Sequence, residues 1–264
     1  MRFADGKLMA EVDDGVGVVT FNNPEKRNAM SVDMWQGLDE ALGRLEGDDA
    51  VRVVVLTGAG HQAFVSGADI SQFEEKRGDA NARREYDRLT SAGRERLARF
   101  PKPTIARIRG YCLGGGLGIA LQADLRIAAA DSRFGIPAAR LGIAYGFDMT
   151  RQLVQLVGPA HARMLLYTGT RVDAREAARM GLVNQVVPDE DLSNRVVDLA
   201  RTIADNAPLS VRAAKLTIAA ALADPDQRDM DDVRRVEAAC FDSEDYREGR
   251  SAFLEKRSPR FKGA

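Results

Sequence analysis

A run of three glycines is the part of this sequence best suited to chemistry. The glycines at positions 114–116 follow a strand-like segment, 103–113, and lead into an apolar, helix-like segment that ends near residue 124. Backbone without side chains can approach a ligand closely, and the first N–H groups of a helix attract negative charge. Two N–H groups aimed at one point form an oxyanion hole, which stabilises the charge that develops on a carbonyl oxygen. The run has the form of an oxyanion hole, although tight packing of a helix against a sheet is the commoner role of a glycine cluster taken alone.

The same run does not match a dinucleotide-binding motif. The sequence GGGLGI lacks the third glycine of the GxGxxG pattern, and no acidic residue follows at the distance that ribose binding requires. The sequence therefore excludes a Rossmann-type site.

Strand-like and helix-like segments alternate over the first two hundred residues and would position the glycine run. Residues 51–58 are nearly all apolar and β-branched, as in a strand covered on both faces of a mainly parallel sheet. Ser31 suits the N-cap of a helix, and residues 78–99 predict a charged helix. This alternation indicates an α/β fold. From Leu192 onward the pattern is helical, and its amphipathic segments are too few to form a core alone, which predicts burial against another subunit.

Composition excludes several classes of function. Lys and Arg total 38 against 39 Asp and Glu, so no basic field indicates nucleic acid binding. Cys112 and Cys240 are too few for a disulfide framework and lack zinc-ligand spacing, so we expect no metal site and a reducing cytoplasm. The N-terminus has no signal-peptide core, and the apolar stretches are broken before membrane length. These features predict a cytoplasmic protein that binds a small molecule and contacts no membrane.

Two segments carry a family resemblance: AFVSGADI at residues 63–70 and KPTIARIRGYCLGGGLGIALQADLRIAAADSRFGIP at residues 102–137. They resemble the signature regions of the crotonase (enoyl-CoA hydratase/isomerase) family, whose substrates are acyl-CoA thioesters. The likeness extends through NNPEKRNAMS, LVGPAHARMLLYTG and EAARMGLVNQVVP to the C-terminal tail. The resemblance implies a crotonase-like ββα spiral core over residues 1–204. It also implies a helical oligomerisation region over residues 205–264, which forms a homotrimer or a dimer of trimers.

The resemblance assigns site residues by position. The two oxyanion-hole donors would be the N–H groups of Ala68 and Gly115. Coenzyme A belongs to the substrate, so no separate cofactor is expected. The residues expected to contact it are Lys26, Arg27, Ala68, Ile70, Phe253 and Lys256, the last two often from a neighbouring subunit. Alternative roles are solvated surface cations for Lys26 and Arg27, and packing in a trimer core for Phe253.

The sequence departs from the family where the two catalytic glutamates should stand. Those positions hold Gly118 and Ala138, neither of which can exchange a proton. Tyr145 matches a tyrosine used in methylmalonyl-CoA decarboxylases of this family, whose tail is also similar, although those enzymes carry a histidine at the position of Ala68. The alternative for Tyr145 is packing with a satisfied hydroxyl. Asp148 could act as a base or substitute carboxylate, or only as a first-turn helix acid.

The sequence thus supports three hypotheses about function. The leading one is an acyl-CoA lyase that works through a thioester enolate and is a hydratase by resemblance. The second is a decarboxylase of malonyl-type or methylmalonyl-type thioesters, centred on Ala68, Gly115 and Tyr145. The third is an acyl-CoA-binding protein without catalysis, which keeps the glycine-rich loop but not the proton-transfer groups.

Overall fold

Two β-sheets form the framework of the part of the chain that the structure describes. This computed structural model describes residues 1–69 and 80–264. In the larger sheet the strand order is β1-β2-β3-β4-β6-β8-β11, antiparallel up to β3 and parallel from there on. Its strands are β1 (Arg2–Phe3), β2 (Leu8–Asp13), β3 (Val16–Phe21), β4 (Val53–Gly58), β6 (Thr104–Ile108), β8 (Leu125–Ala129) and β11 (Gln185–Val187). The apolar run predicted as a doubly covered strand is the central strand β4, which is buried over most of its length.

The smaller sheet has the order β10-β9-β7-β5, with β5, β7 and β9 parallel and β10 antiparallel to β9. Its strands are β5 (Ala63–Val65), β7 (Tyr111–Leu113), β9 (Arg133–Gly135) and β10 (Arg171–Asp173). Because β5 and β7 run parallel, their C-terminal ends meet at one edge of this sheet. The two segments that resemble the family signatures leave the sheet at that edge.

The chain repeats one order of elements: a strand of the larger sheet, a strand of the smaller sheet, then a helix. Strands β4 and β5 precede α3 (Ala80–Ala98), β6 and β7 precede α4 (Gly115–Gln122), and β8 and β9 precede α5 (Phe147–Thr168). This recurrence confirms the expected ββα spiral. The charged helix predicted for residues 78–99 is α3, in which Tyr86 and Leu97 are buried.

The prediction of one continuous strand over residues 103–113 is wrong. The segment divides into β6 and β7, which belong to different sheets. Gly110 lies at the division with a φ of +63°, and a Cβ atom there would stand 2.1 Å from the Gln62 carbonyl oxygen. Only glycine allows the chain to turn so closely against the neighbouring backbone.

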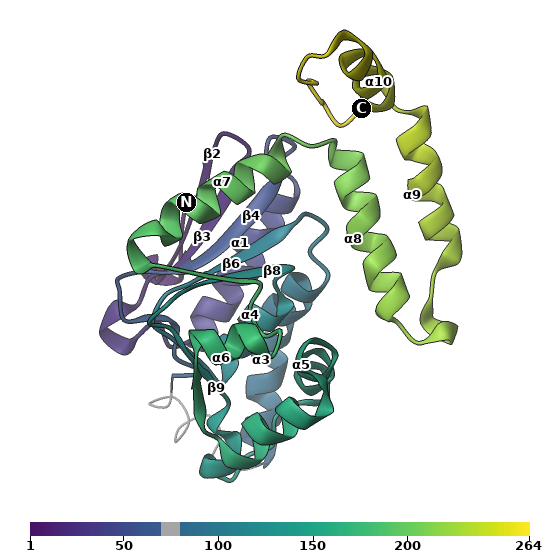
Figure 1. Ribbon diagram of the computed structural model, residues 1–264. Helices are drawn as coiled ribbons and strands as arrows, with labels where there is room; N and C mark the ends of the chain where they lie inside the picture. The colour runs from purple at the N-terminus through teal and green to yellow at the C-terminus, as the bar shows by residue number, and fades with distance from the viewer. Residues whose placement is uncertain (70–79) are drawn as a thin grey trace.

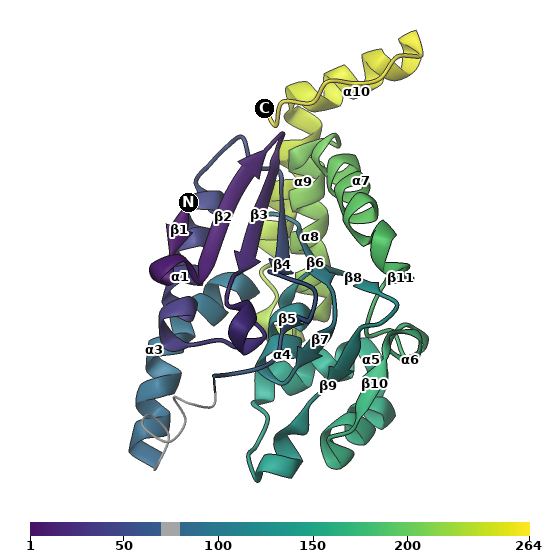
Figure 2. The same cartoon turned by 90° about the vertical axis from the view of Figure 1, so that its left-hand side faces the viewer.

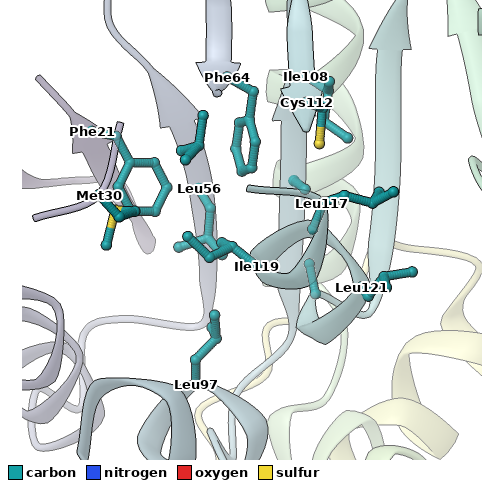
Figure 3. Close-up of a cluster of buried hydrophobic side chains, with 14 of the residues drawn as sticks. Phe21, Met30, Leu56, Phe64, Leu97, Ile108, Cys112, Leu117, Ile119 and Leu121 are labelled. Carbon is teal, nitrogen blue, oxygen red and sulfur yellow. The ribbon is translucent and has the colours of Figure 1, made fainter. Parts of the chain in front are cut away.

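The main core lies between the sheets and the helices α1 (Val32–Glu46), α3 and α4. Figure 3 shows Phe21, Leu56, Phe64 and Leu117 in this cluster, with α4 at its centre. Helix α4 is apolar around its whole circumference and almost entirely buried, which fixes its N-terminus firmly against the edge of the smaller sheet. A second apolar cluster lies under α7 (Leu192–Ala204), which covers the other face of the larger sheet (Figure 1). The short helix α6 (Ala174–Arg179) lies between β10 and β11.

Three helices extend the chain beyond the sheets: α8 (Pro208–Leu222), α9 (Met230–Asp242) and α10 (Glu244–Glu255). Figures 1 and 2 show α10 at the far end of this arm. Lys215 ties α8 to the core through a 2.8 Å ion pair with Asp124. Large apolar side chains on the arm remain exposed: Ile218, Leu222, Met230, Phe241, Tyr246, Phe253 and Leu254. The helical character expected for this region is confirmed, while its role in trimer formation stays a prediction.

Over the described ranges, the structure contains no helix with the length and apolarity needed to cross a bilayer.

Candidate active site

Two tight turns bring the predicted oxyanion donors together. Gly67, after β5, has a φ of +122°, and Gly114, after β7, has a φ of +52°. Such backbone conformations favour glycine, because a Cβ atom would clash with the chain. A Cβ atom built on Gly115 would lie 3.8 Å from the backbone nitrogen of Ala68. The structure therefore places the two residues on facing sides of one site.

In the described part of the chain, neither the N–H group of Ala68 nor that of Gly115 donates a backbone hydrogen bond. Ala68 forms a bridge with Met30, but the bonds run from Met30 N to Gly67 O (2.8 Å) and from Asp69 N to Met30 O (2.9 Å). The bridge thus uses the groups on either side of Ala68 and fixes its peptide without using its N–H. Gly115 is the first residue of α4, where an N–H group has no acceptor within the helix. Both residues are partly exposed, so a ligand can reach them.

Lys26 and Arg27 lie beside this turn. The Lys26 ammonium group forms a 2.8 Å ion pair with the nearly buried carboxylate of Asp69. Ser66 N donates to the Arg27 carbonyl oxygen at 3.1 Å, and the Arg27 guanidinium lies 5.6 Å from the centre of the Tyr111 ring. Both cations are exposed at the rim of the oxyanion site. Their predicted contact with coenzyme A agrees with this placement and stays a prediction.

The space where the first family glutamate would stand is already filled. Gly118 is buried in the second turn of α4. A Cβ atom built on it would lie 2.6 Å from Met149 Sδ and 3.2 Å from Tyr145 Oη. Ala138, at the second glutamate position, is buried in the short helix η4 (Pro137–Leu141). Met149, which borders this position, was not predicted from the sequence, because an apolar side chain carries no chemical signal of its own.

Tyr145 is brought close to the oxyanion hole. Its hydroxyl donates to the carbonyl oxygen of Gly114 at 3.4 Å, one residue before the proposed donor Gly115. Burial, with a smaller effect from Cys112, raises the pKa of Tyr145 above its ordinary value. Burial likewise raises the pKa of the Cys112 thiol. Both groups therefore stay protonated at neutral pH, and the Tyr145 hydroxyl can donate a hydrogen bond.

Asp148 faces differently from its neighbours. It lies in the first turn of α5 with an exposed side chain, whereas Met149 is partly buried beside Gly118. Successive helical residues point about 100° apart, so the two do not share a face. This exposure agrees with the alternative role as a first-turn acid. A catalytic role for Asp148 stays a prediction.

The remaining predicted residues are not assembled at the site within one chain. Phe253 is 84% exposed on α10, and Lys256, also exposed, ends that helix with a φ of +54°. Figure 1 shows α10 at the far end of the arm, away from α4. A contribution from these residues thus requires a neighbouring subunit, as the resemblance implies. Ile70 lies outside the described residues.

Comparisons with known proteins agree with this architecture. A family model described as enoyl-CoA hydratase/isomerase matches residues 11–264. The short-chain-enoyl-CoA hydratase of Clostridium acetobutylicum is 39% identical over 95% of each chain. The crotonyl-CoA hydratase of Syntrophomonas wolfei is 37% identical over 96% of this chain and 97% of its own. The crystal structure of an enoyl-CoA hydratase/carnithine racemase from Magnetospirillum magneticum has a TM-score of 0.91 and 36% identity, over 97% and 96% of the two chains. The chain therefore belongs to the enoyl-CoA hydratase/isomerase family.

Proposed function

We propose that this protein is an acyl-CoA lyase that holds a thioester enolate between the N–H groups of Ala68 and Gly115. The observation that carries this proposal is the approach of the two donors at the ends of β5 and β7. Hydrogen bonds to a developing oxyanion stabilise an enolate whichever reaction forms it. Hydratase activity on short enoyl-CoA substrates is the first candidate, supported by the relatives named for that activity.

Hydration by this site would differ from the usual two-carboxylate mechanism. Water must be activated at the β-carbon and a proton delivered to the α-carbon. Neither Gly118 nor Ala138 can do either. The protonated hydroxyl of Tyr145, which lies beside Gly114, is the candidate proton donor, and Asp148 is the candidate base if substrate binding brings it inward.

Decarboxylation is the second candidate, favoured by the position of Tyr145. When a malonyl-type thioester loses carbon dioxide, the electrons of the breaking C–C bond form the enolate, whose oxygen would lie in the hole. No base is needed, and the α-carbon then takes one proton. The Tyr145 hydroxyl occupies the space left by the absent glutamate and stays protonated, so it is suited to donate toward the enolate.

One set of incubations separates these functions. Purified protein is incubated with crotonyl-CoA, 3-hydroxybutyryl-CoA and methylmalonyl-CoA, and the products are followed by mass. Interconversion of the first two supports hydration, and propionyl-CoA from the third supports decarboxylation. Binding of these thioesters without any product supports the third hypothesis, a non-catalytic acyl-CoA-binding protein, and overturns the proposed lyase.

We further propose that the working assembly is a homotrimer or a dimer of trimers in the cytoplasm. The exposed apolar side chains of α8–α10 support an assembly, because a thin helical arm cannot bury them within one chain. A neighbouring subunit would also be needed to bring Phe253 and Lys256 to the substrate. Coenzyme A enters as part of the substrate, and no separate cofactor takes part.

A further inference from the structure

Helix α4 contains three glycines whose roles differ. A glycine inside a helix destabilises it by about 1 kcal/mol relative to alanine, so each needs a physical reason. A Cβ atom on Gly115 would meet nothing closer than 3.8 Å, so no neighbouring atom requires glycine there. One on Gly116 would lie 2.0 Å from the Val65 carbonyl oxygen, so that glycine is required by the backbone of β5. Gly118 differs from both, because the atoms that crowd it belong to side chains.

The side chains that crowd Gly118 come from one short stretch of the sequence. Tyr145 and Met149 flank the start of α5, and their ends lie 3.2 Å (Oη) and 2.6 Å (Sδ) from the position of the missing Cβ atom. Gly146 is the N-cap between them, and its own missing Cβ would lie 3.6 Å from Met149 Cε, an ordinary contact. We define Gly118, Tyr145 and Met149 as the Gly118 socket.

Packing, rather than hydrogen bonding, must hold the Tyr145 hydroxyl in the Gly118 socket. In the described part of the chain, the hydroxyl has one hydrogen bond, to Gly114 O at 3.4 Å. That is well beyond the ordinary O–H···O range of about 2.5–3.0 Å, so the bond orients the hydroxyl weakly. Gly118 borders the space that the Tyr145 hydroxyl occupies, and Met149 reaches the same position from α5.

We propose that Gly118 and Met149 are positioning residues that direct the Tyr145 hydroxyl toward the acyl group held by Ala68 and Gly115. This proposal rests on the proposed function and adds which residues hold the Tyr145 hydroxyl near the enolate. A side chain at position 118 would force Met149 to shift and the Tyr145 hydroxyl to give by a few tenths of an ångström. A shorter side chain at position 149 would leave the phenol room to move.

Acetoacetyl-CoA tests this proposal without requiring turnover. This β-keto thioester ionises to an enolate that absorbs in the near ultraviolet, so a pH titration of the bound probe reports how well the site stabilises an enolate. Tyr145→Phe removes the hydroxyl and should raise the pKa of the bound probe by about one to two units, since a hydrogen bond to a charged group stabilises it by roughly 1.5–3 kcal/mol. Gly118→Ala should raise it by at least half as much.

We expect that the shifts in the pKa of the bound probe caused by Gly118→Ala and Met149→Ala do not add. Met149→Ala alone should raise the pKa of the bound probe by less than Gly118→Ala. The double variant Gly118→Ala/Met149→Ala should be closer to wild type than Gly118→Ala alone, because the new methyl group takes the space that Met149 vacates. Gly43→Ala is the matched control: it is also a helical glycine, and its Cβ would meet Arg96 at an ordinary 3.5 Å. That variant should leave the titration unchanged.

Each outcome decides a different claim. If the enolate pKa is the same in wild type, Gly118→Ala and Met149→Ala, the positioning role is overturned while the oxyanion site stands. If wild type does not bind acetoacetyl-CoA, the proposed function is overturned and the positioning role with it. If Gly118→Ala does not fold by circular dichroism, Met149→Ala and Tyr145→Phe carry the test. In that case an unshifted titration in Met149→Ala rejects the proposal.

Discussion

Replacing Gly118 and Ala138 with glutamate should raise crotonyl-CoA hydration strongly only when Met149 is shortened as well. The two substitutions supply the carboxylates that the family uses, and correctly placed acid–base groups contribute roughly two to four powers of ten each. At position 118, however, the new Cβ atom would lie 2.6 Å from Met149 Sδ, about 1 Å inside an ordinary contact. Either the Met149 side chain or the added glutamate must therefore shift from its place.

The displacement sets the expected order of the variants. Misplacing a catalytic group by about 1 Å can cost roughly a hundredfold in rate, so Gly118→Glu/Ala138→Glu should hydrate crotonyl-CoA less well than the same variant with Met149→Ala. The triple variant should exceed wild type by at least about a hundredfold. Met149→Ala alone serves as its background, and Gly43→Ala controls for a substitution at a helical glycine.

The assay follows the loss of crotonyl-CoA and the appearance of 3-hydroxybutyryl-CoA by mass, with circular dichroism and crotonyl-CoA binding measured on each variant. A triple variant that folds and binds crotonyl-CoA but hydrates it no faster than Met149→Ala would refute the reasoning. The acyl pocket would then suit another reaction, and the decarboxylase proposal would replace the hydratase.

Three further predictions address the other parts of the site. Gly115→Pro should lower turnover of the best substrate by about a hundredfold to a thousandfold, since it removes one oxyanion donor; a folded variant with normal turnover would contradict the site. Removal of the chain from Pro208 onward should give insoluble or dissociated protein by sedimentation analysis, whereas an active, well-folded monomer would disprove the role of the arm. Because burial raises the pKa of Tyr145, a rate that depends on its proton should not fall up to about pH 10. If the wild-type rate falls at a lower pH, and Tyr145→Phe removes that fall, the phenol ionises at a lower pH than the structure indicates.

The oxyanion site illustrates what could be predicted before the structure. Residues 114–116 occur between apolar segments of strand and helix character, and their lack of side chains is a local property of the backbone. The pairing of Gly115 with Ala68 followed from family resemblance, and the parallel strands β5 and β7 supply its physical reason. The placement of Lys26 and Arg27 beside Ala68 also agrees with expectation, although it leaves their ligand untested.

Other features depend on contacts between distant residues. The division of residues 103–113 between two sheets follows from the approach of Gly110 to Gln62, which no periodicity in the segment reveals. The exposed position of Phe253 follows from the direction of the arm, which is set by contacts such as that of Lys215 with Asp124.

By itself, the sequence determined the α/β class, the glycine-rich turn and the absence of glutamate at positions 118 and 138, because these depend on residue identity and on neighbours along the chain. Only the tertiary structure decided what fills the vacated space. The first turn of α5 and the residues just before it bring Met149 and Tyr145 against Gly118, some thirty residues earlier in the chain. The distances on which their proposed shared role rests arise from that packing. Side-chain contacts across such a separation depend on the whole fold, so a single sequence does not express them.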